Sequence, residues 1–199
     1  THTPLDGIPF LPDCTYLVII RDPRDVYFSS LNHRDNMNDE ELANNVFPSG
    51  EQAFQDWLTT EREPGVWDVQ CLDSLCHFLK TYWDWRALPN VHLFHYSDMK
   101  RDLRGTIAKM AAATGVELTD TQLDEYTQAA SFDSMKSNAD QFAPGSGTGM
   151  WKAETNFFAN GTNAQWQDKL SATELAEFDA RLAELLPAEQ AAWMLNGNG

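Results

Sequence analysis

The sequence predicts an α/β domain of three layers, in which helices flank a mostly parallel β-sheet. Two short apolar runs, residues 15–20 and 91–95, have the length of strands. The first is rich in β-branched residues and does not alternate, which is typical of a strand buried on both faces. Each run leads within a few residues into a helix-start signal, at Pro23 and at Ser97. Repeated strand-to-helix units of this kind build parallel sheets.

Length and composition favour one domain over residues 1–199. The chain has 199 residues, 42% of them hydrophobic, and seven tryptophans, which suffice for one sizeable core. Its 14 basic and 30 acidic side chains give a formal net charge of -16. This charge repels polyanions, so nucleic acid is not an expected partner, although a local cluster of donors can still bind a small anion.

The sequence predicts no membrane attachment. It contains no run of 18 uncharged apolar residues and does not begin with a basic and then apolar segment, so we expect a cytoplasmic protein. The cysteines are odd in number, which favours reduced thiols, at Cys14, Cys71 and Cys76.

The helices before the second strand are predicted from caps and apolar spacing. Asp22 is the expected N-cap of a helix that begins at Pro23. Two surface helices are expected over residues 38–45 and 49–61, capped by their first residues. Residues 72–85 carry apolar side chains at three- and four-residue spacing, which predicts a helix that packs on the sheet.

After the second strand, Ser97 is expected to cap a helix over residues 98–113 that ends at Gly115. Two shorter helices are expected over residues 119–130 and 131–137. Residues 138–163 are rich in Gly, Asn, Ser and Thr and predict a long loop, which is a candidate lid because long loops in compact domains are usually functional or disordered. A capping box at residues 171–174 predicts a last helix.

The strongest site signal lies where the first strand meets its helix. Arg21 ends the strand and Arg24 and Ser29 follow, at the edge of the sheet where α/β proteins bind ligands. A guanidinium, a hydroxyl and helix-start amides can converge there on a phosphate. An internal ion pair between Asp25 and either arginine explains the same residues equally well.

Other polar groups predict no site. His92 and His95 are three apart on a strand and face opposite sides, so we assign no metal site. Residues 145–149 are glycine-rich but follow no strand and lack the P-loop ending, which favours a flexible loop. His2 stands at the start of the chain, where fraying is the ordinary expectation. A run of basic side chains on one helix is expected to be solvated, at Lys100, Arg101, Arg104 and Lys109.

Residues 17–30, Leu-Val-Ile-Ile-Arg-Asp-Pro-Arg-Asp-Val-Tyr-Phe-Ser-Ser, resemble the 3′-phosphate-binding motif of cytosolic-type sulfotransferases that use PAPS (3′-phosphoadenosine 5′-phosphosulfate). The resemblance implies that Arg21 and Ser29 hold the 3′-phosphate. It also implies a P-loop NTPase-like sulfotransferase fold, here lacking its first strand and loop.

Further segments resemble the same family in the same order. Residues 94–99 are similar to the motif whose tyrosine contacts adenine, which implies that role for Tyr96. Residues 130–136 are similar to the motif that packs on the base, which implies roles for Ser131, Phe132 and Met135.

Residues 157–161 resemble the family's second phosphate loop, which usually reads Arg-Lys-Gly where this chain has Ala159, Asn160 and Gly161. Contact with phosphate would then rest on backbone amides and the Asn160 side chain. One lost charged hydrogen bond costs on the order of 1.5–3 kcal/mol, or roughly 10- to 100-fold in affinity. Arg24 is the candidate replacement.

Residues 1–5 resemble the Lys-Thr-His-x-Pro segment of the family, which implies that His2 is the catalytic base. The lysine of that segment, the Pro-Lys-Ser/Thr-Gly-Thr loop that binds the 5′-phosphosulfate and the first strand would precede residue 1, and we expect them in a preceding segment of the same gene. Ser29 is expected to tune that lysine, which makes it catalytic as well.

The resemblance implies an enzyme that transfers a sulfonyl group from PAPS to a hydroxyl or amine of a small-molecule acceptor and releases PAP, with His2 as general base and no metal. Two alternatives stay open: a non-catalytic module that binds PAP or a partner, and a P-loop kinase-like phosphotransferase. The pattern identifies neither the acceptor nor the oligomeric state.

Overall fold

The computed structural model describes residues 2–63, 65–66, 69–159 and 161–198. Within them the sheet consists of two parallel strands, β1 (Tyr16–Ile20) and β2 (Val91–His95), paired from Tyr16 with Val91 to Ile20 with His95. Each strand leads directly into a helix, α1 (Pro23–Asn36) after β1 and α5 (Tyr96–Arg101) after β2. The parallel sheet and its two strand-to-helix units confirm the predicted fold class.

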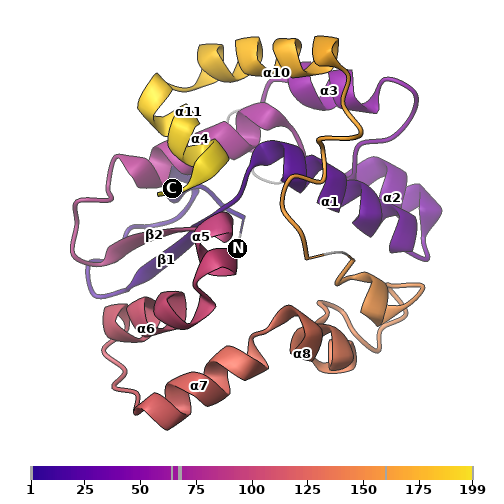
Figure 1. The fold of residues 1–199 in the computed structure, drawn as a ribbon. Helices are drawn as coiled ribbons and strands as arrows, with labels where there is room; N and C mark the ends of the chain where they lie inside the picture. Colours follow the sequence, from indigo (N-terminus) through magenta and orange to yellow (C-terminus); the bar gives the residue numbers. More distant parts are fainter. Residues whose placement is uncertain (1, 64, 67–68, 160, 199) are drawn as a thin grey trace.

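Helices lie on two sides of the sheet, which gives the expected three layers, although the described residues leave one face of β1 largely uncovered (Figure 1). In Figure 1, α4 (Leu72–Trp83) and the C-terminal helices α10 (Ala172–Leu185) and α11 (Ala188–Asn196) lie above the strands, α6 (Leu103–Ala113) lies below them, and α5 stands at their ends. The remaining helices and 3₁₀ turns are η1 (Leu5–Gly7), α2 (Glu40–Val46), α3 (Ala53–Thr59), α7 (Asp120–Ala129), α8 (Phe132–Ser137), α9 (Ala139–Phe142) and η2 (Glu154–Asn156).

The main core lies between the sheet, α4 and α10. Leu72 and Leu79 of α4 and Phe178 of α10 are fully buried there, as the apolar spacing of residues 72–85 predicts. Burying a side chain of this size contributes about 1.5–3 kcal/mol relative to leaving it exposed. The contacts of α4 therefore hold the sheet and the C-terminal helices together.

One expectation for β1 is wrong. Val18 and Ile20 are buried at 4% exposure, whereas Leu17 and Ile19 remain 39% and 50% exposed. Successive side chains of a strand point to opposite faces, and the described residues cover only one face of β1. The apolar run therefore forms a half-buried strand and not one buried on both faces.

Several helix boundaries also differ from the sequence prediction. The helix expected over residues 98–113 is divided at Asp102, whose carboxylate accepts from Gly105 N at 2.8 Å and starts α6. Asp39 caps α2 instead of residue 38, because its carboxylate accepts from Leu42 N at 2.9 Å. Helix α11, which begins after Pro187, was not predicted.

Two other helix starts follow their sequence signals. Asp22 caps α1 by accepting from Arg24 N at 2.9 Å, and Pro23 occupies the first turn. Ser171 and Glu174 form the predicted capping box at the start of α10. Local signals therefore define the helices that flank the strand-end region and the C-terminal layer.

The predicted long loop of residues 138–163 contains α9 and η2 and is attached to the end of α1. Trp151 pairs with Met37 in an isolated antiparallel bridge, and the Asn36 amide donates to Ala153 O at 2.9 Å. Trp151 is buried against Met37, and its indole donates to Pro144 O at 2.6 Å. The segment is therefore anchored to α1, and its role as a lid stays a prediction.

Candidate functional site

The candidate site lies at the carboxyl ends of the two parallel strands. Arg21 follows β1 and Tyr96 follows β2, directly after the last pair of the ladder, Ile20 with His95. This register places the two side chains next to each other, and the Arg21 guanidinium carbon lies 4.4 Å from the Tyr96 ring centroid. Ligands of α/β proteins bind at this edge of the sheet.

Arg21 is partly engaged and keeps donor capacity. Its Nη2 donates to Thr162 O at 2.9 Å and lies 3.8 Å from a carboxylate oxygen of Asp25. Its Nε is buried and has no hydrogen-bond partner within the described part of the chain. A buried charged donor without a partner costs free energy, so this nitrogen fits a site that an anion completes.

Asp25 attaches residues 164–165, which follow the predicted phosphate loop of residues 157–161, to α1. Its carboxylate is 2% exposed and accepts from Ala164 N at 2.9 Å and from Gln165 N at 2.8 Å. Burial raises its pKa above the usual value, against the lowering effect of the two backbone N–H groups and of Arg21. Ala164 has a φ of 60°, an unfavourable conformation for a residue with a Cβ, so the loop holds strain next to the site.

Ser29 lies on the face of α1 that the loop crosses. Helical periodicity places it one turn after Asp25 and two turns before Asn36, whose side chain holds Ala153. Ala153 and residues 164–165 are therefore attached to opposite ends of α1, and Ser29 lies on the helix between the two attachment points. Ala159 and Gly161 belong to the segment between these attachments, and Asn160 lies outside the described residues.

Phe132 and Gly161 form a close contact beside the loop. A Cβ built on Gly161 would lie 2.3 Å from the Phe132 ring, and Gly161 has a φ of +59°. The Phe132 ring also packs edge to face on the Phe158 ring, with the two ring centroids 6.5 Å apart. Only glycine fits this position, so the loop and the aromatic ring are placed together.

Ser131 and Met135 belong to the helix that carries Phe132. The Ser131 hydroxyl accepts from Ser134 N at 3.3 Å and donates to Gln128 O at 2.8 Å, so it caps α8. Met135 N donates to Ser131 O at 2.9 Å. These contacts give both residues a structural part in presenting Phe132, and contact with a base stays a prediction for each.

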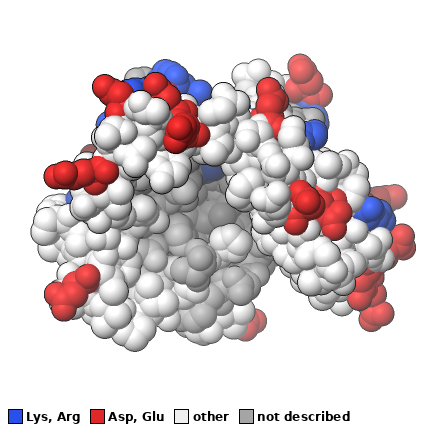
Figure 2. All heavy atoms as spheres, turned by 90° about the horizontal axis from the view of Figure 1, so that it is seen from below, with Lys and Arg blue, Asp and Glu red and all other residues white. Residues whose placement is uncertain are grey.

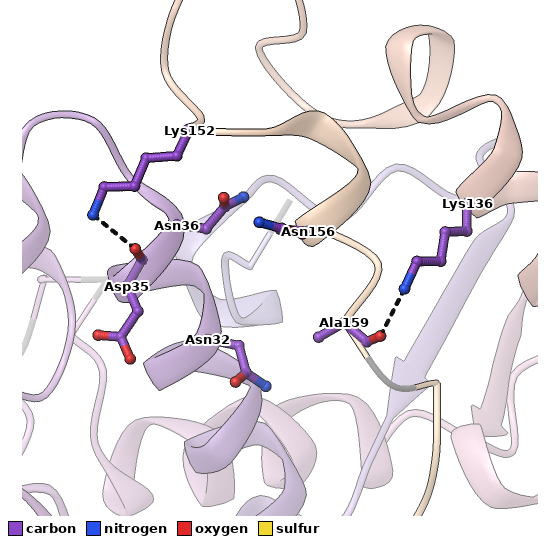
Figure 3. A pocket seen from close by; sticks show the side chains of 7 residues that line it. All are labelled: Asn32, Asp35, Asn36, Lys136, Lys152, Asn156 and Ala159. Carbon is purple, nitrogen blue, oxygen red and sulfur yellow. Dashed lines mark hydrogen bonds between the residues drawn. The ribbon is translucent and has the colours of Figure 1, made fainter.

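A polar cavity of about 350 Å³ opens beside the loop (Figure 3). Its lining comes from α1, from α8 and from residues 152–159, which follow α8 in the chain. It consists of Asn32, Asp35, Asn36, Lys136, Lys152, Asn156 and Ala159. Lys136 Nζ donates to Ala159 O at 3.0 Å. Lys136 lies inside the motif at residues 130–136, although its role could not be predicted from the sequence.

Arg24 lies beside Trp166, at the end of residues 157–166, and its guanidinium is paired with Asp22. Its Nε and Nη2 donate to the two carboxylate oxygens of Asp22 at 3.0 and 2.7 Å. Its guanidinium carbon lies 3.7 Å from the Trp166 ring centroid and 5.0 Å from that of Phe178. The expected pair with Asp25 is therefore found for Arg21, at 3.8 Å, whereas Arg24 pairs with Asp22 instead. A role for Arg24 in place of the missing basic residues stays a prediction.

His2 has different neighbours from Arg21 and Ser29. It is exposed and lines a small pocket together with Pro4, Arg62, Val66, Ser74 and His77. The backbone that follows it is held to α4, since Leu5 N donates to Thr81 Oγ1 at 3.0 Å. The described structure thus brings together Arg21, Tyr96 and the loop, and it does not bring His2 into a shared cavity with them.

His95 and Arg104, for which the sequence predicted no site, have structural partners. His95 is fully buried, with Nε2 3.0 Å from Met194 O and Nδ1 accepting from Ser97 N at 3.2 Å, and burial lowers its pKa. Arg104 donates to Asp120 and Asp124 at 2.9 and 2.7 Å, as expected for a solvated basic run. Among the described residues, no group of three or more His, Cys, Asp or Glu could hold a metal ion.

Three further features concern the chain as a whole. The three cysteines are free, as predicted. Acidic side chains lie around much of the face shown in Figure 2, in keeping with the net charge of -16. No described helix combines the length and the apolar character needed to cross a bilayer.

Comparison with known proteins identifies relatives over nearly the whole chain. Residues 1–188 match the family described as sulfotransferase domain. A glycolipid sulfotransferase of Mycobacterium bovis (strain BCG / Pasteur 1173P2) is 31% identical, covering 99% of this chain and 68% of its own length. One from Mycobacterium tuberculosis (strain ATCC 25177 / H37Ra) has the same identity and the same coverage.

Solved structures share the fold. Mouse sulfotransferase SULT7A1 complexed with PAP superposes with a TM-score of 0.74 at 20% identity, over 98% of this chain and 67% of that one. Retinol dehydratase in a complex with retinol and PAP superposes with a TM-score of 0.71 at 22% identity, over 94% of this chain and 52% of that one. At these identities the similarity shows the α/β fold.

Proposed function

Because the chain belongs to the sulfotransferase domain family, we propose that it transfers a sulfonyl group from PAPS to a hydroxyl or amine of a small-molecule acceptor. The observation that carries the proposal is the strand-end site, where Arg21 stacks on Tyr96 and keeps a buried, unpartnered Nε among the described residues. A nucleotide needs an anion contact and an aromatic surface, and this edge of the sheet supplies both.

The proposed nucleotide site combines three elements. Arg21 and Ser29 bind the 3′-phosphate, with the backbone of Gly161 and the Asn160 side chain. Tyr96 and Phe132 contact the adenine, and Ser131 and Met135 support Phe132 from α8. Ala159 contributes its backbone only, since its methyl group has no polar atom. The structures of SULT7A1 and retinol dehydratase in complex with PAP support this choice of nucleotide.

In the proposed reaction His2 accepts the proton of the acceptor hydroxyl or amine. The acceptor oxygen or nitrogen then forms a bond to sulfur, and the bond between sulfur and the 5′-phosphate oxygen breaks. The electron pair of that bond stays on the phosphate of PAP. An imidazole is suited to proton transfer near neutral pH, and fixed orientation of the reactants lowers the barrier further.

Glycolipids are the first acceptors to test. The mycobacterial relatives are glycolipid sulfotransferases by name, and their 31% identity extends over 99% of this chain. A sugar hydroxyl of a glycolipid belongs to the proposed acceptor class, because it offers an oxygen nucleophile with a proton to remove.

The test is transfer of radiolabelled sulfur from PAPS to glycolipids, alcohols, phenols and amines, followed by separation of the products. We expect a labelled sulfonated acceptor. PAP binding without any labelled product would favour the non-catalytic module, and transfer of labelled phosphate from ATP would favour the kinase-like alternative.

The His2→Ala variant tests the base. We expect turnover to fall by at least 100-fold, within the range for loss of a general base, while PAP binding changes by less than about twofold. His77→Ala is the matched control, because His77 lines the same small pocket and its Nε2 lies 2.9 Å from a carboxylate oxygen of Asp6. Unchanged turnover in His2→Ala would show that another group takes the proton.

A further inference from the structure

The phosphate loop of this chain has no positive charge of its own. Residues 157–166 contain neither lysine nor arginine, and Ala159 occupies the position that the resemblance assigns to an arginine. Arg24 is poorly placed to supply the charge, because its Nε and Nη2 donate to Asp22 and its guanidinium is stacked on Trp166 beside Phe178. A nucleotide with a 3′-phosphate would therefore need another cation here.

Lys136 reaches the loop from a different element. It extends from α8, and its Nζ donates to Ala159 O at 3.0 Å (Figure 3). The same nitrogen lies 5.6 Å from the centroid of the Phe132 ring, so it is also next to the proposed adenine contact. An ammonium group has three N–H donors, and the Ala159 carbonyl occupies one of them.

The cavity beside Ala159 gives these donors room for a ligand. Its volume of about 350 Å³ lies between the ammonium of Lys136 and the face of α1 that carries Asn32. Asn32 is three residues after Ser29, hence one helical turn further along α1. Its Nδ2 is buried without a hydrogen-bond partner in the part of the chain that the structure describes.

We propose that Lys136, together with the amide of Asn32, binds the 3′-phosphate of the nucleotide and replaces the basic side chain that is absent at Ala159. This inference rests on the proposed function, because it assumes that PAPS or PAP is the ligand. The cation comes from the helix that carries Phe132, so one short helix holds both the base and the phosphate. Selectivity for a 3′-phosphorylated nucleotide follows from Lys136.

The test compares the binding of PAP and of adenosine 5′-phosphate by titration calorimetry. For Lys136→Met we expect PAP to bind roughly 10- to 100-fold more weakly, as for the loss of one charged hydrogen bond. Adenosine 5′-phosphate has no 3′-phosphate, so its affinity should change by less than about twofold. Lys109→Met is the control for net charge, because Lys109 is exposed on α6.

A rescue variant separates phosphate binding from support of the loop. Adding Ala159→Arg to Lys136→Met should recover PAP affinity at least tenfold, since a guanidinium then occupies the cavity beside the loop. Circular dichroism and thermal melting show whether each variant is folded.

Two results would overturn the inference. An equal loss of affinity for PAP and for adenosine 5′-phosphate in Lys136→Met would make the lysine a residue that supports the loop, and an unchanged affinity for both nucleotides would give it no part in binding. Failure of the unmodified protein to bind PAP would instead refute the proposed function itself.

Discussion

The guanidinium of Arg21 stacks on the ring of Tyr96 at 4.4 Å, and this contact joins the residues that follow two neighbouring parallel strands. A cation over an aromatic face is stabilised by about 0.5–2 kcal/mol, depending on its exposure to water. The stack therefore holds Arg21 in place before any ligand arrives, with its Nε buried beneath the surface.

Arg21→Lys should weaken nucleotide binding more than it weakens the fold. Lysine keeps the charge but loses the planar group that stacks on Tyr96 and donates to Thr162. We expect PAP affinity to fall roughly 10- to 100-fold and the free energy of unfolding to change by less than about 1 kcal/mol. Calorimetric titration and urea unfolding of the same preparations measure both effects.

Arg24→Met should show the opposite pattern. The side chains of Arg24 and Asp22 are 11% and 10% exposed, so removal of the guanidinium leaves the Asp22 carboxylate buried without its counter-ion. We expect a loss of about 3 kcal/mol in the free energy of unfolding, with PAP affinity nearly unchanged well below the melting temperature. A folded Arg24→Met protein that binds PAP tenfold more weakly would contradict the structural role of this pair.

Gly161→Ala should disrupt the contact between the loop and Phe132. The added Cβ would lie 2.3 Å from the ring, and the φ of +59° is unfavourable for alanine. We expect PAP affinity to fall at least tenfold. Gly147→Ala is the matched control, because Gly147 has a φ of +72° and open space around it. Similar affinity losses in both variants would mean that backbone strain alone is responsible.

The stability of the protein should decrease as the pH falls below about 6.5. Burial lowers the pKa of His95 and of His33 in the folded state, so between those lowered values and about 6.5 the unfolded chain holds more protons. The free energy of unfolding therefore rises with pH in this window. The stability contributed by the two neutral histidines is fully present above the window and is lost as the pH falls through the folded pKa values. Urea unfolding at several pH values measures the slope.

His95→Gln isolates the part of this slope that belongs to one ring. The His95 imidazole lies near Asp98, Asp22 and Arg101, and its Nδ1 accepts from Ser97 N, a bond that protonation removes. Asp25 has a raised pKa, so its titration changes the free energy of unfolding with the opposite sign. The contribution of His95 is therefore the difference between the slopes of the unmodified protein and of His95→Gln. A slope in His95→Gln equal to that of the unmodified protein would exclude His95 as a contributor.

Local signals predicted much of the framework. Asp22 and Pro23 start α1, and Ser171 with Glu174 starts α10, because a cap acts on backbone groups within three residues of itself. The break at Asp102 was missed, since the apolar spacing continues across it. Burial on one face of β1 depends on which elements cover the strand, and the sequence pattern of an apolar run does not contain that information.

The site was predictable to the extent that its residues lie next to strand ends. Arg21 and Tyr96 both follow strands, and the parallel register then places them together. The partner of Arg24 could not be chosen from sequence, because Asp22 and Asp25 are both within reach. Lys136 was missed because its partner, Ala159, is 23 residues away along the chain and is chosen by tertiary packing.

The attachment of residues 153–165 to α1 affects which substitutions this part of the chain can tolerate. Asn36 secures one end through Ala153, and Asp25 secures the other through Ala164 and Gln165. Both ends are fastened by side chains of α1 that bond to the backbone of the segment, so these attachments do not depend on which side chain the segment carries at position 159. Position 159 can therefore lose or regain charge while both attachments persist, and ligand preference can change there without refolding, whereas Gly161 is constrained by Phe132.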